Sequence, residues 1–541
     1  MSKSTTLFRS AFLAMAVVLA SSASAQMSSG PMPKVAKVTV NQPVTLTDNG
    51  DSWTMDNGIV KMSLLKRNGN LTSLVYHGVE VLTRGQYWEQ VPSGTVTATV
   101  TIDPATNGGQ RAEVSVKGVY NGDNTPPPFL GSAPAATPGA APGAGGRGGR
   151  GGGAPGAPGA RPVAAGAPRG SVGLDIETRF TLERGSSGFY TYAEYTHKAS
   201  YPAAGEGESR FILESMNRTF DWLSVDNDRN MLMSSALGGP GGRGITIHAK
   251  EQSIYTGGIY KNSVEHKYTY NSQMYKLQAW GWSSTKDHIG VYFINPSNEY
   301  IGGGPEKLDL IDHLTGTILD YWTSGHYGGG AGNHIPTGED WKHVVGPIFV
   351  YFNALDNPKE PAQADLDKFT ASYGSGMPAV PTAWRDNALA LWDDAVAKSK
   401  TVKAAWPFDW VQGMDYAKKD GRSTVTGQLV LDDPQAAKKT LPHLTVGLAH
   451  PNYPGTGSAY EQRGGNGNIV TWAHDGDYYQ FWTDGSEDGR FSIANVRPGK
   501  YTLHAFADGV LGEYAKANIT VEAGKKIDLG KLDWQPVRYG K

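Results

Sequence analysis

A series of short segments rich in β-branched and aromatic residues constrains the fold of this chain most strongly. Each segment is bounded by Gly, Pro, Asn or Asp, and such bounded runs predict strands of a sheet and not helices. The clearest are ATVTIDP, RAEVSVKGVY, LDIETRFTLE, FYTYAEYTH, HIGVYFIN and VGPIFVYFNA. The sequence therefore predicts a mostly β protein whose sheets pack face to face as a sandwich.

One segment departs from this pattern and predicts a helix that closes the first domain. Residues 380–402 (VPTAWRDNALALWDDAVAKSKTV) carry apolar side chains at helical spacing, with Asp386 near the start. A new series of strand signals with Gly-centred turns then follows. We expect a first domain over residues 26–405 and a small sandwich of the fibronectin or carboxypeptidase-regulatory type over residues 421–537.

The segment at residues 124–170 differs in composition from both predicted domains. It consists almost entirely of Pro, Gly and Ala with scattered arginines, so it has little to bury and cannot offset the entropy of ordering. We expect a disordered Pro/Gly/Ala-rich insert between two strands of the first domain.

The amino terminus predicts export. Lys3 and Arg9 precede an apolar run at residues 11–20, and the ASA triplet at residues 23–25 offers small residues for signal-peptidase cleavage. We expect a signal peptide over residues 1–25 and a secreted or periplasmic protein. No later run approaches the roughly 20 apolar residues that span a bilayer, which predicts no membrane partner.

The composition excludes two classes of function. The chain has no cysteine, which rules out thiol catalysis and zinc–thiolate sites. Its formal net charge of −2 gives no basic field for nucleic acid. The 14 Trp and 26 Tyr suit a surface that stacks on sugar rings, although β sheets also use these residues structurally. Either reading applies to Trp280, Trp282 and Trp322, which would line a sugar cleft or pack in the core.

The stretch YWTSGHYGGGAGNH, from Tyr321 to His334, admits three readings from its residues alone. Its glycines lack the Lys-Ser/Thr of a phosphate-binding loop, and no HExxH pattern accompanies its histidines. Glu339 and Asp340 are close enough in sequence to keep a metal site open. The third reading is a single imidazole, His326, that transfers a proton. His334 receives no role.

Several segments occur in an order that resembles the rhamnogalacturonan lyases of polysaccharide lyase family four. They include ERGSSGFYTYAEY, GESRF, KYTY, PSNEYIGGGP, TSGHY, GPIFVYFN and VRPGKYTLHAFADGVLGEY. The resemblance implies a large β-sandwich of the galactose-mutarotase type followed by a fibronectin type III-like sandwich. The sequence ends at PVRYGK, about where the family's third domain, a jelly roll, would begin, so we expect either a truncated chain or a two-domain variant.

The resemblance also implies the site residues. The catalytic pair falls on Lys267 of KYTY and His326 of SGHY, and substrate-binding roles fall on Arg210, Tyr321 and Glu299. One departure affects the site, since this chain reads KLQAW where many family members read K-x-H-G-W.

The implied reaction is β-elimination at the rhamnose-(1→4)-galacturonate bond of rhamnogalacturonan I, by an endolyase. Arg210 would compensate the galacturonate carboxylate while the C5 proton is removed. Lys267 would be the base and His326 the acid that protonates the leaving O4, and the sequence permits the reverse assignment.

Two alternatives stay open at this point. One is a non-catalytic carbohydrate-binding protein, and the other is an aldose epimerase-like enzyme on the same sandwich. No cofactor is expected to be required and no metal site is assigned, although Glu306 and Asp309 are compatible with a structural calcium ion. We expect a monomer whose partner is the acidic wall polysaccharide.

Overall fold

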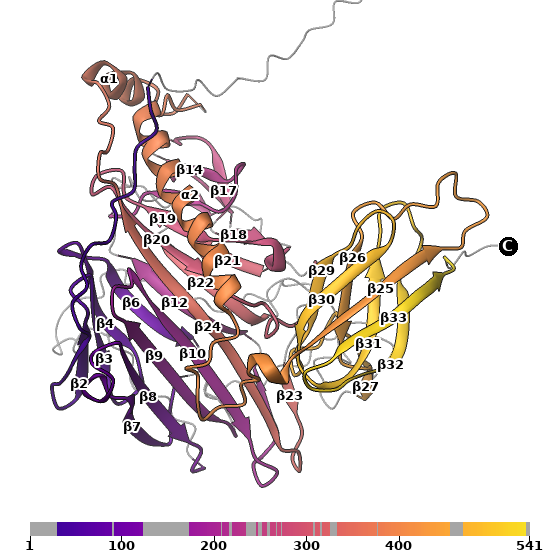
Figure 1. Ribbon diagram of the computed structural model, residues 1–541. Coiled ribbons are helices and arrows are strands. Elements are labelled where there is room, and N and C mark those ends of the chain that lie inside the picture. Colours follow the sequence, from indigo (N-terminus) through magenta and orange to yellow (C-terminus); the bar gives the residue numbers. More distant parts are fainter. Residues whose placement is uncertain are drawn as a thin grey trace, which may run out of the picture.

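The computed structural model shows two β-sandwiches joined by a long helix and an extended connection (Figure 1). The mostly β fold class, with a large sandwich followed by a small one, is confirmed. The structure describes residues 30–88, 91–122, 173–206, 208–215, 219–233, 245–246, 252–256, 260–266, 268–271, 273–306, 309–313, 316–324, 333–375, 377–454 and 469–536. The predicted signal peptide and the 124–170 insert lie outside these residues, and so do Lys267 and His326.

The first sheet of the large sandwich is antiparallel and, within the described residues, runs in the order β1-β2-β3-β4-β6-β12-β22-β21-β18, with β5 paired to β4. Its strands are β1 (Thr45–Asp48), β2 (Ser52–Asp56), β3 (Val60–Leu65), β4 (Leu71–Tyr76), β5 (Val79–Glu80), β6 (Leu82–Trp88), β12 (Glu208–Ser215), β18 (Tyr268–Asn271), β21 (Asp309–His313) and β22 (Thr317–Ser324).

The second sheet of the large sandwich runs in the order β14-β13-β19-β20-β24-β10-β9-β8-β7 over the same described ranges. Its strands are β7 (Thr95–Ile102), β8 (Arg111–Val119), β9 (Asp175–Glu183), β10 (Gly188–His197), β13 (Trp222–Ser224), β14 (Asn230–Leu232), β19 (Trp280–Ser283), β20 (Ile289–Ile294) and β24 (Trp341–Ala354). All six segments predicted as strands from the sequence lie in this sheet, as β7, β8, β9, β10, β20 and β24.

The core of the large sandwich lies between these two sheets. Side chains such as Phe211 and Trp322 from the first sheet meet Phe293 and Val350 from the second. Along β24 almost every residue is buried, because one face of the strand meets this core and the other is covered by a helix. Burial on both faces explains why this strand is a continuous apolar run.

Two helices follow the second sheet, α1 (Gln363–Ala371) and α2 (Thr382–Ala405). Helix α2 corresponds to the predicted helix at residues 380–402, whereas α1 was not predicted. Leu391, Trp392 and Ala395 of α2 pack on the outer face of the second sheet. The orange helix in Figure 1 crosses β20 and β24 on that face. No described helix is long and apolar enough to cross a membrane.

The second domain packs two sheets around its own core. Its first sheet has the order β30-β25-β33 and its second the order β29-β26-β31-β32, with the short pair β27-β28 alongside. The strands are β25 (Ser423–Leu431), β26 (Thr445–Ala449), β27 (Tyr453–Pro454), β28 (Ile469–Val470), β29 (Phe481–Asp484), β30 (Arg490–Val496), β31 (Gly499–Phe506), β32 (Tyr514–Val521) and β33 (Lys526–Trp534).

The remaining elements are short. The pair β11-β23 and the three-stranded sheet β15-β16-β17 lie beside the large sandwich, and three 3-10 turns complete the described elements. They are β11 (Ala204–Glu206), β15 (Ile245–Thr246), β16 (Gln252–Ile254), β17 (Val264–His266), β23 (Asn333–Ile335), η1 (Pro104–Thr106), η2 (Met274–Lys276) and η3 (Lys419–Gly421).

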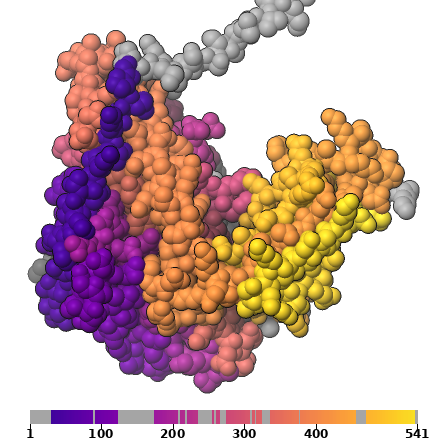
Figure 2. All heavy atoms as spheres, viewed as in Figure 1, coloured from indigo at the N-terminus to yellow at the C-terminus, as the bar shows by residue number. Residues whose placement is uncertain are grey.

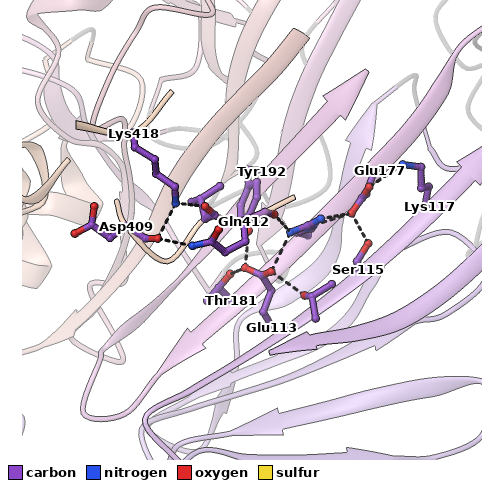
Figure 3. Close-up of polar contacts among 12 residues, drawn as sticks. Glu113, Ser115, Lys117, Glu177, Thr181, Tyr192, Asp409, Gln412 and Lys418 are labelled. Atoms are coloured by element: carbon purple, nitrogen blue, oxygen red, sulfur yellow. Dashed lines mark hydrogen bonds and ion pairs between the residues drawn. The ribbon is translucent and has the colours of Figure 1, made fainter. Parts of the chain in front are cut away.

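The connection between the domains, residues 406–422, is held on the outer face of β8 and β9 by a buried polar network (Figure 3). Arg179 pairs with Glu177 at 2.6 Å and with Glu113 at 3.3 Å, and it donates to the backbone carbonyl of Gln412 at 2.6 Å. Thr181 and Tyr192 donate to the other oxygen of Glu113. Through this paired and hydrogen-bonded network, the connection is anchored at Gln412 to the outer face of the large sandwich.

Candidate active site

Arg210 and Tyr321 lie side by side on adjacent strands of the first sheet. They are direct cross-strand partners in the β12–β22 ladder, and the guanidinium carbon of Arg210 lies 4.8 Å from the centre of the Tyr321 ring. Side chains alternate along a strand, and their sequence neighbours Phe211 and Trp322 belong to the sandwich core. Arg210 and Tyr321 therefore occupy the face of the sheet that points away from that core.

Tyr321 also belongs to an apolar cluster on this face of the first sheet. Ile212 of β12, Leu310 of β21 and Leu319 of β22 pack with Tyr321, and each of the four is at least 98% buried. Arg210 itself is 8% exposed. A guanidinium in such weakly polar surroundings attracts a carboxylate more strongly than it would in water.

Two side-chain amides on the same face were not predicted from the sequence. Gln86 of β6 is the cross-strand partner of Ile212, and Asn70 donates to the Gln86 carbonyl at 3.1 Å. The carbonyl of Asn70 and the amino group of Gln86 have no partner in the described structure. These groups have the chemistry to hydrogen-bond sugar hydroxyls, but nothing in the local sequence distinguishes them.

The two predicted catalytic residues lie outside the described residues, although their neighbours are placed. Tyr268, which follows Lys267, begins β18 and pairs with His313, which in turn pairs with Thr317 at the start of β22. Ser324, two residues before His326, ends β22. The described strands thus place these neighbours at opposite ends of β22 and do not by themselves bring the two candidates together.

Arg210 lies toward the end of β22 that leads to His326. The preceding residue, Ser209, pairs with Thr323, and Glu208 pairs with Ser324. Of the five predicted site residues, the structure brings Arg210 and Tyr321 into contact. This contact lies near the carboxyl end of β22, the end of the strand that precedes His326 in the sequence.

Glu299 forms ion pairs with two arginines near the start of the second domain. It lies in the connection after β20, and its carboxylate accepts hydrogen bonds from Arg422 at 2.5 and 2.9 Å. Arg497 adds a second guanidinium at 3.8 Å. Both oxygens of Glu299 are therefore bound by arginine, and its predicted substrate-binding role stays a prediction.

The three tryptophans that were expected either to line a sugar cleft or to pack in the core are core residues. Trp280, Trp282 and Trp322 are each fully buried within the large sandwich. Trp280 donates its indole N–H to the carbonyl of Leu319, and Trp282 donates to a carboxylate oxygen of Asp312. They therefore do not form a sugar-stacking surface.

Two buried acids support β21 and β22 from the core side. Asp320 accepts hydrogen bonds from Tyr300 at 2.7 Å and from Asn295 at 2.9 Å. Asp312 accepts from Trp282 at 3.0 Å, and burial raises the pKa of its carboxyl well above the usual range. Both acids face away from the Arg210 side of the sheet.

The described residues contain no group of three or more His, Asp or Glu side chains arranged to hold a metal ion. Glu306, one of the two acids considered for calcium, accepts a hydrogen bond from Gln273 at 2.8 Å. The calcium ion stays a prediction.

Two protein families match this chain, one in each sandwich. A family described as "Rhamnogalacturonate lyase family" matches residues 163–256, which include Arg210. A second, described as "Polysaccharide lyase family 4, domain II", matches residues 453–529 of the second domain. The resemblance predicted from the sequence is therefore confirmed.

Individual relatives agree with these families. The chain is 25% identical to the rhamnogalacturonate lyase of Dickeya dadantii over 364 residues, which cover 66% of this chain and 50% of the relative. It is 27% identical to rhamnogalacturonate lyase B of Emericella nidulans over 279 residues, which cover 51% of this chain and 34% of that relative. The aligned region thus spans half the length of these relatives or less.

Among solved structures, a galactose mutarotase-like protein from Lactobacillus casei is 9% identical, covering 56% of this chain and 99% of that one with a TM-score of 0.28. At this TM-score the likeness carries no weight, and the fold description rests on the sheets themselves.

Proposed function

We propose that this chain, which resembles rhamnogalacturonate lyases in both of its sandwiches, is an exported endolyase that acts on pectic rhamnogalacturonan I. It cleaves the rhamnose-(1→4)-galacturonate bond by β-elimination and leaves an unsaturated galacturonate at the new non-reducing end. The observation that carries the proposal is the Arg210–Tyr321 pair on the outer face of the first sheet, in which Arg210 lies within the segment that matches the lyase family.

In the proposed reaction, Arg210 compensates the negative charge of the galacturonate carboxylate. The proton at C5 of galacturonate becomes acidic only when the adjacent carboxylate is compensated and the developing enediolate is stabilised. A guanidinium binds a carboxylate through two parallel N–H donors, and it holds positive charge where negative charge grows in the transition state. The stacked ring of Tyr321 limits the orientations open to the guanidinium.

Two proton transfers complete the reaction. A neutral amine at Lys267 removes the C5 proton, and a protonated imidazole at His326 delivers a proton to the leaving O4, or the two roles are exchanged. The C5–H bond breaks, a C4–C5 double bond forms, and the C4–O4 bond breaks with its electrons on the rhamnose-bearing oxygen. No redox partner is required.

The test is incubation with rhamnogalacturonan I while the ultraviolet absorbance of the unsaturated uronide is followed. We expect the absorbance to rise with the native protein. The rate of this rise should be lower by about 10²-fold or more for Lys267→Ala and for His326→Ala. Circular dichroism checks that both variants fold. Binding of the polysaccharide without new absorbance would contradict the proposal, and native rates in both variants would remove these two residues from the mechanism.

A further inference from the structure

A cavity of about 270 Å³ lies between the two domains, and neither Arg210 nor Tyr321 lines it. Its walls come from the turn η2, the loop after β20, the end of α2, and strands β29 and β30 of the second domain. Figure 2 shows the second domain, in yellow and light orange, attached to the large domain along one side. Ligand pockets occur preferentially at domain boundaries, and this volume is near their lower limit of about 300 Å³, which suits a small ligand.

Trp482 lines the cavity, and its ring is held in place by three contacts. Gly447 is its cross-strand partner in β26, where a Cβ atom would lie only 2.1 Å from the indole ring. The Trp482 indole N–H donates to Gln480 at 2.9 Å, and Trp472 packs edge-on at 5.5 Å. Because its N–H is used and its orientation is fixed, Trp482 presents a rigid aromatic surface of the kind that packs on the C–H face of a sugar ring.

A second aromatic side chain enters from the large domain. Tyr275 of η2 lines the cavity, and its hydroxyl donates to Asp484 of the second domain at 2.8 Å. Lys276 pairs with the same carboxylate at 3.1 Å. The Asp484 charge is therefore compensated, and the Tyr275 ring is held at the cavity wall by contacts from both domains.

The cavity also contains a cation with no acidic partner. Lys403, in the last turn of α2, donates to the backbone carbonyl of Leu277 at 2.9 Å, and burial lowers its pKa. In the described part of the chain no carboxylate lies at ion-pair distance from it. Glu299 lines the same cavity, but Arg422 already binds both of its oxygens. An ammonium in this position favours an anionic ligand.

The remaining polar wall offers hydroxyl groups. Ser297, Thr483 and Ser492 line the cavity, and Ser492 is exposed on β30. Hydroxyls both donate and accept hydrogen bonds, as sugar hydroxyls require. Aromatic surfaces, hydroxyls and one cation thus meet in a space of small-ligand size.

We propose that this cavity between the domains is a binding site for an acidic sugar unit, a uronate whose ring packs against Trp482 and Tyr275 and whose carboxylate pairs with Lys403. The site is separate from the face that carries Arg210, and it does not depend on the proposed lyase activity.

The test uses the full chain labelled with fluorotryptophan and fluorine NMR, with galacturonate as the probe and galactose as its neutral counterpart. The resonance of Trp482 is identified by its loss in Trp482→Phe, so that binding elsewhere on the protein is not counted. We expect a saturable shift of this resonance with galacturonate and at least tenfold weaker binding of galactose, because the carboxylate contact is missing.

Matched variants locate the site. Lys403→Met should weaken galacturonate binding by about tenfold or more, whereas Lys400→Met, at an exposed position of the same helix, should not change it. Ser492→Tyr fills the cavity from an exposed position without removing core packing, and it should abolish the shift. The proposal is overturned if no saturable shift occurs, if galactose binds as well as galacturonate, or if Lys403→Met and Ser492→Tyr both bind like the native protein.

Discussion

Glu299 of the large domain and Arg422, the last residue of the connection to the second domain, form a bidentate ion pair with nitrogen–oxygen distances of 2.5 and 2.9 Å. The side chains are only 6% and 1% exposed, and the Arg422 guanidinium also lies 4.3 Å from the centre of the Trp406 ring. Removing one partner of a buried pair leaves an uncompensated charge away from water. The pair therefore makes the stability of the domain junction depend on Glu299.

Replacing Glu299 by Gln should destabilise the protein by roughly 3–5 kcal/mol, because the Arg422 charge is left buried without its counter-ion. Denaturant unfolding measures the change, with Arg490→Met at the exposed Arg490–Asp488 pair as the control expected to unfold like the native protein. Native stability combined with lost cleavage of rhamnogalacturonan I would instead place Glu299 in substrate binding.

Replacing Arg210 by Met should reduce the rate of uronide formation by about 10²- to 10³-fold, the usual effect of removing a group that stabilises developing negative charge. Arg210→Lys should recover only part of the loss, because an ammonium keeps the charge without the two-pronged geometry. Initial rates on rhamnogalacturonan I give both numbers. Arg84→Met is the control, since Arg84 pairs with Glu214 elsewhere on the same sheet. Equal losses in the Arg210 and Arg84 variants would argue against a specific role.

Of the six strands that the sequence predicted, β8, β9, β10, β20 and β24 are largely buried, and β7 is largely exposed. Strands β20 and β24 are largely apolar because both of their faces are covered, whereas β9 alternates apolar core residues with polar ones such as Glu177 and Arg179. By contrast, β1 is mostly exposed and α1 buries little beyond Phe369, so neither carries a strong hydrophobic pattern. Such elements form because their neighbours position them, which a single sequence does not reveal.

The candidate site was predictable in its residue types but not in its geometry. Arg210 and Tyr321 came from the family resemblance, yet their contact depends on the β12–β22 register, which includes an irregularity between Ser209 and Arg210. The Glu299–Arg422 pair joins residues 123 positions apart, and no local pattern marks either partner. Long-range pairings of this kind follow from the packing of whole domains.

His343 should make the domain junction sensitive to acid. Its ring is fully buried, stacked between Trp341 at 5.6 Å and Tyr479 of the second domain at 4.5 Å. Burial, with a further contribution from nearby Arg497, lowers the pKa of His343 to about 4, against 6.5 for an unperturbed group. Between these pH values the unfolded chain binds a proton that the folded chain does not, so stability falls as pH decreases from about 6.5 to about 4.

The comparison with His343→Phe isolates this contribution, because Phe keeps an aromatic ring in the stack and does not titrate. The native protein should lose about 3 kcal/mol more than the variant between neutral pH and pH near 4. Asp475, whose pKa burial raises to about 7, contributes with the opposite sign and cancels in the difference between the two proteins. Parallel pH profiles in denaturant unfolding would contradict the role of His343.

A methyl group at position 304 should disturb the contact between the domains. Gly304 has φ +84°, and a Cβ atom there would lie 2.3 Å from the ring of Trp472 in the second domain. Gly338 has a similar φ of +95° with no atom within 4 Å of the added carbon. Both Gly→Ala changes cost backbone strain of roughly 1–3 kcal/mol, but only Gly304→Ala adds a steric clash of a further 1–3 kcal/mol or so. Denaturant unfolding measures the difference, and limited proteolysis within residues 406–422 should be faster for Gly304→Ala alone. If the two variants unfold and are cleaved alike, Trp472 moves aside freely and this contact does not hold the domains together.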